Sequence, residues 1–132
     1  MKKRLNLKLL SVLCVVVIAF LALSTFALSA KPVRVEAWIG AGGGDITLRN
    51  VSIHFEPNVL TKDTKIFIID FGNNEYQFGS EIHIEDDTFF TVCFTVPPTK
   101  VITFIKGEWV EVDGYDGSGC FETNHFSRYR GC

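Results

Sequence analysis

The stretch that decides the fold is Phe89-Phe90-Thr91-Val92-Cys93-Phe94-Thr95-Val96. Apolar side chains alternate in it with Thr and Cys, so one face of an extended chain is apolar and the other is polar or small. Pro97 and Pro98 follow, and neither can donate a backbone hydrogen bond to a neighbouring strand. The stretch therefore predicts a β-strand that buries one face and ends at the prolines.

The same pattern recurs along the chain in short pieces separated by Gly, Pro, Asn and Asp. Further strands are expected at residues 32–38, 45–49, 51–55, 63–71, 81–85, 101–105, 108–112, 120–123 and 126–130. No stretch after residue 30 shows a sustained helical period. About nine short strands in roughly a hundred residues are typical of an all-β, antiparallel β-sandwich.

The first thirty residues differ from this domain. Lys2, Lys3, Arg4 and Lys8 precede an apolar run, and small residues around Ala30 follow it. That order predicts a signal peptide over residues 1–30, cleaved before Lys31, and a domain over residues 31–132. An uncleaved membrane anchor is the alternative, because the run is long enough to cross a bilayer. Both place the domain outside the cytoplasm, secreted or anchored, with a membrane contact only if the segment is uncleaved.

The charge of the domain argues against nucleic-acid binding. The whole chain has 13 Lys plus Arg and 15 Asp plus Glu, and residues 1–30 contain four of the bases and none of the acids. The remaining domain therefore has a net charge of about −6, whereas a nucleic-acid partner requires clustered positive charge.

The domain has an odd number of cysteines. In an oxidising compartment, Cys93, Cys120 and Cys132 allow one bridge and a leftover thiol. A Cys120–Cys132 bridge would close a loop of about a dozen residues and stabilise the fold by roughly 2–4 kcal/mol. Cys93 is the alternative partner of either one, and three reduced thiols are a further possibility.

Three patterns that suggest ligand sites have simpler explanations. The glycine-rich residues 40–45 precede a strand rather than the helix a phosphate loop requires. Residues 113–119 place two Asp in a loop, yet Asp-Gly is ordinary turn chemistry. His54 and His83 each alternate with apolar residues, which places them on polar strand faces without a metal partner at a telling spacing. No cofactor and no metal is therefore expected.

Several segments together resemble a ZU-five-type domain, the β-sandwich of ankyrins, netrin receptors and death-domain scaffolds. They are residues 41–48 (AGGGDITL), 51–60 (VSIHFEPNVL) and 63–66 (DTKI), and at the end 107–112 (GEWVEV) and 125–129 (HFSRY). The resemblance implies a secreted or surface-anchored protein-interaction module with an unknown protein partner and no catalysis on external substrates.

Some relatives of that type are similar at His-Phe-Ser and cleave themselves there. By this resemblance, Ser127 Oγ would attack the Phe126 carbonyl while His125 takes the hydroxyl proton, and the C–N bond would break to leave an ester and a free Ser127 amine, an N-to-O acyl shift. Water would then hydrolyse the ester. A distorted peptide bond would help to drive the reaction. The alternative function is thus a self-processing module that cleaves its own Phe126–Ser127 bond.

A further alternative is a carbohydrate or cell-wall binding module. It would use Trp38, Trp109 or Tyr115 as exposed stacking platforms. Packing in the core or in a hairpin is the simpler explanation of these aromatics, and for Trp109 it is the favoured one.

Overall fold

The structure is a computed structural model that describes residues 31–132, of which residues 32–132 form one compact unit. The predicted signal or anchor segment lies outside the described residues. Within them, no helix has the length and the apolar composition that crossing a bilayer requires. The described part is all-β, as the sequence predicts.

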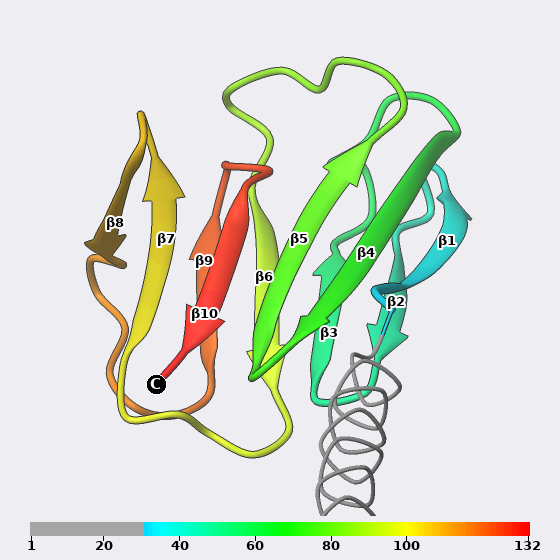
Figure 1. The fold of residues 1–132 in the computed structure, drawn as a ribbon. Helices are drawn as coiled ribbons and strands as arrows, with labels where there is room; N and C mark the ends of the chain where they lie inside the picture. Colours follow the sequence, from blue (N-terminus) through cyan, green and yellow to red (C-terminus); the bar gives the residue numbers. More distant parts are fainter. Residues whose placement is uncertain (1–30) are drawn as a thin grey trace, which may run out of the picture. The chain divides into compact units, whose positions relative to one another are not determined.

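Ten strands form the domain (Figure 1). They are β1 (Val33–Ile39), β2 (Gly44–Leu48), β3 (Val51–Phe55), β4 (Thr64–Gly72), β5 (Glu75–Ser80), β6 (Phe90–Phe94), β7 (Val101–Ile105), β8 (Glu108–Glu111), β9 (Cys120–Thr123) and β10 (Arg128–Gly131). Every pair of neighbouring strands is antiparallel.

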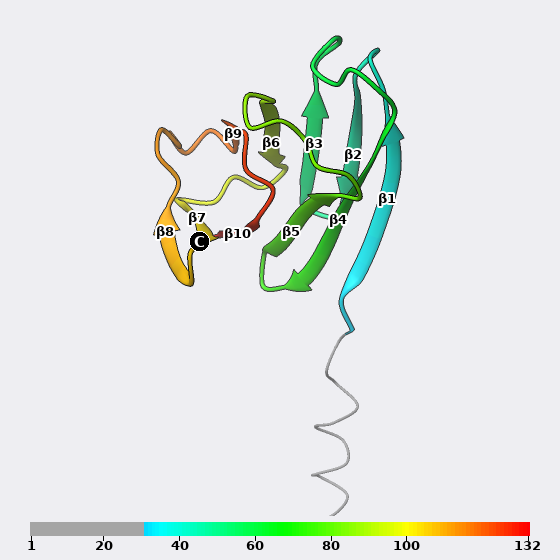
Figure 2. The same cartoon turned by 90° about the horizontal axis from the view of Figure 1, so that it is seen from above.

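The strands build two packed sheets. One has six strands in the order β1-β4-β5-β10-β7-β8, and the other has four in the order β2-β3-β6-β9. In Figure 1 the four-stranded sheet lies behind β4, β5 and β10, and Figure 2 shows the two layers from above. The antiparallel sandwich predicted from the sequence is therefore confirmed.

The core lies between the sheets and is rich in aromatic rings. Tyr76 of β5 meets Phe94 of β6 with ring centroids 6.2 Å apart, and Phe121 of β9 lies 5.5 Å from Tyr129 of β10. These contacts join one sheet to the other. Alternation in β3, β4 and β6 adds fully buried aliphatic side chains: Val51, Ile53, Ile66, Ile68 and Val92. The period of two in the sequence thus becomes one continuous core.

A glycine allows the chain to pass from β1 in one sheet to β2 in the other. Gly43 has a φ of 74°, and its amide donates to the Gly40 carbonyl over 3.0 Å. A Cβ on Gly43 would collide with the Phe55 carbonyl oxygen. Residues 40–43 therefore form a tight turn that leads into β2, and position 43 requires glycine.

One expected strand is absent and another replaces it. Residues 81–85 form part of a loop, whereas β5 occupies Glu75–Ser80 with Tyr76 and Phe78 facing the core. The pairing partner explains the difference. Ser80 lies opposite Ile66, and β4 begins only two residues earlier, at Thr64. Because the two strands are antiparallel, residues after Ser80 soon extend beyond the start of β4 and have no strand beside them. The Ile82 and Ile84 alternation thus has no ladder to join.

Candidate functional site

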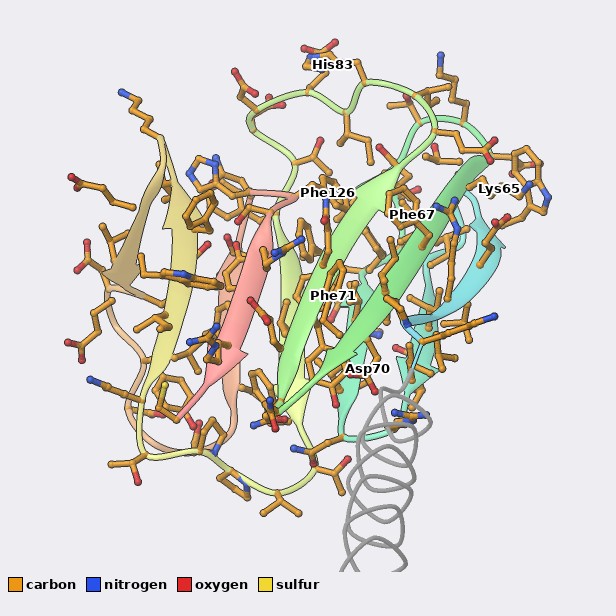
Figure 3. All side chains as sticks on the ribbon, in the orientation of Figure 1. Lys65, Phe67, Asp70, Phe71, His83 and Phe126 are labelled. Atoms are coloured by element: carbon orange, nitrogen blue, oxygen red, sulfur yellow. A yellow bond between two sulfur atoms is a disulfide. The ribbon has the colours of Figure 1, made fainter. Side chains whose placement is uncertain are left out.

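One end of the sandwich, called the open end below, has the loop of residues 81–89 with a hollow on each side. Residues 81–89 connect β5 to β6 over this end (Figure 1). The large hollow, of about 690 Å³, lies between this loop and residues 54–64. The small hollow, of about 500 Å³, lies between the loop, β5 and residues 124–126. His83, labelled at the tip of the loop in Figure 3, lines both.

The loop is fastened at a few points. The Glu81 amide donates to the Lys65 carbonyl over 3.2 Å, and Asn124 Nδ2 donates to the Asp86 carbonyl. Ile84 packs against the core, while Ile82 and Phe89 are 39% and 48% exposed. The loop is therefore anchored at its start, at Asp86 and through the Ile84 side chain, and it presents two large apolar side chains to solvent.

The large hollow combines a partly apolar floor, to which buried Thr64 and Thr88 also contribute, with an acidic rim. Leu60 and Phe90 are nearly fully buried at its base. The carboxylates that line it belong to Glu56, Glu85, Asp87 and Glu122, and Lys62 is the one Lys or Arg among its lining residues. The small hollow is lined by Glu81 and Asp86 and by no Lys or Arg. Both hollows are therefore negative at neutral pH.

His54 lies at the rim within a polar row on the outer face of the four-stranded sheet. Asp45, His54, Thr91 and Glu122 are register neighbours across β2, β3, β6 and β9. His54 Nδ1 is bonded to Asp45 Oδ1, and its Nε2 lies 3.0 Å from Glu56 Oε1. The hydrogen bond to Asp45 is the largest cause that raises the pKa of His54 above its usual value. His54 is thus on the polar strand face expected for it, whereas His83 lies in the loop and not on a strand.

The His125-Phe126-Ser127 segment precedes β10 instead of forming its start. Phe126 is half-buried and stacks on Phe90, with centroids 4.7 Å apart. Figure 3 shows it where the chain enters β10. Tyr129 Oη donates to the His125 carbonyl over 2.9 Å. His125 and Phe126 line the small hollow, so the segment forms one wall of the candidate site.

Ser127 forms hydrogen bonds with two strands of the six-stranded sheet, β7 and β5. Its Oγ lies 2.7 Å from Thr103 Oγ1, and its carbonyl accepts a hydrogen bond from the Phe78 amide over 3.1 Å. Among residues 31–132, no hydrogen bond links this hydroxyl to a histidine ring. Self-cleavage between Phe126 and Ser127 stays a prediction from the sequence.

The disulfide joins Cys93 to Cys120, so the suggested Cys120–Cys132 pairing is wrong. Cys93 and Cys120 are register partners on β6 and β9, with Cα atoms 4.1 Å apart. Cys132 follows β10 in the other sheet, where its backbone pairs with Thr99 and Lys100. Strand register rather than separation along the chain selects the partner, and the Cys132 thiol is free and exposed.

The three candidate stacking aromatics do not form a common platform. Trp38 and Trp109 lie on β1 and β8, at opposite edges of the six-stranded sheet. Five strand spacings correspond to about 24 Å. Tyr115 packs edge-on against Phe121, and its hydroxyl donates to the Pro98 carbonyl.

Cations cover several rings on the outer face of this sheet. The Arg34 and Arg128 guanidinium groups lie 4.0 and 4.1 Å from the ring centroids of Phe67 and Phe71, which Figure 3 labels on β4. Arg130 lies 4.6 Å from the Trp109 ring. These rings are occupied by the protein's own side chains, so this face does not offer a row of open aromatic surfaces.

Sequence reasoning missed the two hollows. The acidic residues 85–87 lie at a turn before β6, and their neighbours across the hollow come from residues 54–64 and from β9. No local pattern connects these segments. Within residues 31–132, no cluster of three or more His, Cys, Asp or Glu is arranged to hold a metal ion.

Comparison of the chain with protein-family models, with curated proteins and with solved structures gave no match.

Proposed function

We propose that this chain is an exported interaction module that binds another protein at the open end of its sandwich, without catalysis on that partner. The observation that supports the proposal is the pair of hollows beside residues 81–89, where Ile82 and Phe89 are exposed. Loops carried by a rigid sandwich are common positions for recognition, because the scaffold fixes their ends.

Binding rather than catalysis fits the contacts of the reactive side chains. The ring nitrogens of His54 are bonded to carboxylates, and Ser127 Oγ is bonded to Thr103. A nucleophile requires a base within hydrogen-bonding reach, and within residues 31–132 no hydroxyl or thiol is bonded to a histidine ring.

Export is supported by two features. The order of charges, apolar residues and small residues in residues 1–30 is that of a signal or anchor segment. The Cys93–Cys120 disulfide is consistent with an oxidising compartment. Both agree with a secreted or surface-anchored domain.

Photo-crosslinking in the cells that produce the chain tests the proposal. A photoreactive residue replaces His83 in one variant and Glu111 of β8, an exposed residue away from the loop, in the matched control. We expect a protein adduct from position 83 and none from position 111. The absence of an adduct at position 83, or equal adducts at both, would overturn the proposal.

A further inference from the structure

Some acidic residues of the domain are neutralised by neighbouring cations, whereas others, among them Glu108, Glu111 and Asp113, form no ion pair within residues 31–132. On the six-stranded sheet, Glu36 pairs with Arg34 and Lys65, and Glu75 pairs with Arg130. The almost fully buried Asp70 pairs with Arg49 over 2.7 Å. These carboxylates have cations built into the fold.

The carboxylates beside the large hollow have no such partners. Within residues 31–132, Glu85, Asp87 and Glu122 form no ion pair, and Glu56 pairs only with His54. They come from the loop, from β9 and from the end of β3, so separate segments of the chain bring like charges to one rim. Such an arrangement is unfavourable in the empty protein and becomes favourable when a cation enters.

The floor of the same hollow is partly apolar, because buried Thr64 and Thr88 line it together with two apolar side chains. Leu60 and Phe90 close its base, and Ile82 and Phe89 stand exposed beside it. Its volume of about 690 Å³ lies within the range of about 300–1,000 Å³ that ligand sites usually have. A ligand therefore has to satisfy a partly apolar floor and a negative rim together.

We propose that the large hollow docks a cationic peptide segment of the partner protein, in which Lys or Arg alternates with apolar side chains. The inference rests on the proposed function and specifies the chemistry of its partner. Lys and Arg fit both surfaces, because their aliphatic stems pack on apolar residues while their charged ends reach the rim. The Phe89 ring can also receive a cation on its face.

Other occupants fit less well. A nucleic acid would place phosphates against the carboxylates, and an acidic peptide would be repelled in the same way. A bare metal ion would leave the apolar part of the floor uncovered, and residues 31–132 contain no cluster of three metal ligands. Charge and shape together therefore favour a basic, partly apolar peptide.

Three synthetic peptides of equal length test the inference with the purified, disulfide-intact chain. One alternates Lys with Leu, the second Gln with Leu, and the third Glu with Leu. We expect the Lys-Leu peptide to bind at least about tenfold more tightly than the other two by fluorescence anisotropy, with an affinity that falls as salt increases. Amide chemical shifts of residues 81–89 should change on binding.

Two matched variants distinguish the effect of the rim carboxylates on peptide affinity from the effect of the net charge of the domain. The rim variant combines Glu85→Gln, Asp87→Asn and Glu122→Gln, and the control combines Glu108→Gln, Glu111→Gln and Asp113→Asn. Both remove three exposed carboxylates, so their net charges are equal. We expect the rim variant to bind the Lys-Leu peptide about tenfold more weakly and the control to bind as the parent chain does.

The outcomes distinguish this inference from the proposed function. Equal losses in both variants, or no loss in the rim variant, would overturn the cationic docking site. If the Gln-Leu peptide binds as well as the Lys-Leu peptide and Phe89→Ser weakens both, the hollow takes an apolar peptide; the inference then fails while the proposed function stands. Failure of the proposed function itself would appear as the missing adduct at His83.

Discussion

Tyr129 donates its hydroxyl hydrogen to the carbonyl of His125, four residues earlier, over 2.9 Å. The same oxygen lies 3.0 Å from Thr123 Oγ1, and Thr123 Oγ1 accepts the His125 amide over 3.2 Å. A buried tyrosine that bonds to the backbone a few residues upstream is also used in immunoglobulin-type sandwiches to fix a crossing between sheets. Here it fixes the passage from β9 to β10, which forms one wall of the small hollow.

Tyr129→Phe should destabilise the domain without changing its fold. The ring is almost fully buried and stacks on Phe78, so Phe preserves the packing, while the His125 carbonyl and Thr123 lose a hydrogen-bond partner. We expect the free energy of unfolding to fall by about 1–2 kcal/mol in urea titrations. Amide exchange of residues 124–127 should accelerate. An unchanged stability together with unchanged exchange would show that the bond does not fix this segment.

The Cys93–Cys120 disulfide should stabilise the domain substantially. The two residues are separated by 27 positions, for which the loop-closure argument gives about 3.5 kcal/mol. Replacing both by Ala should lower the free energy of unfolding by about that amount, measured without reductant. Cys132→Ser is the matched control and should leave stability unchanged, because that thiol is free. If Cys132→Ser lowered the free energy of unfolding more than the double Ala variant did, the disulfide would not join Cys93 to Cys120.

His54 should titrate above the usual histidine value of 6.5. The bond to Asp45 and the contact with Glu56 favour the charged ring and raise its pKa. This contribution to stability is fully present below pH 6.5 and is lost as pH rises through the folded-state pKa of His54. NMR titration of the ring measures the pKa directly. Asp45→Asn should return it toward 6.5, and a value at or below 6.5 in the parent chain would contradict the pairing.

The Phe126–Ser127 bond should stay intact in the purified protein. Ser127 Oγ is bonded to Thr103 and the flanking carbonyls accept hydrogen bonds, so the segment is fixed at several atoms. We expect a single mass, that of the uncleaved chain, under denaturing conditions. Ser127→Ala should also give a single mass, lower only by the oxygen atom that the substitution removes. Denaturing conditions are needed because β10 pairs with β5 and β7 and would retain a severed end. A mass lacking residues 127–132, absent from Ser127→Ala, would establish self-cleavage instead.

The local alternation of apolar and polar residues was sufficient to predict most of the strands. The alternation in residues 51–55 and 90–94 places Val51, Ile53, Phe90 and Val92 in the core, and the turns fall at Gly, Pro and Asn as expected. These elements are predictable because side chains alternate between the two faces of a strand whatever lies beside it.

By itself, the sequence determined that the domain is all-β and, in strands such as residues 51–55 and 90–94, which side chains face inward, since both follow from local spacing. Tertiary structure alone decided that residues 75–80 pair where 81–85 do not, that Cys120 meets Cys93, and that carboxylates from three segments surround one hollow. Each of these depends on which strands become neighbours, and that choice is made by the packing of the whole core. His125, Phe126 and Ser127 illustrate the difference: their order was plain in the sequence, and their contacts with Tyr129, Phe90 and Thr103 were not.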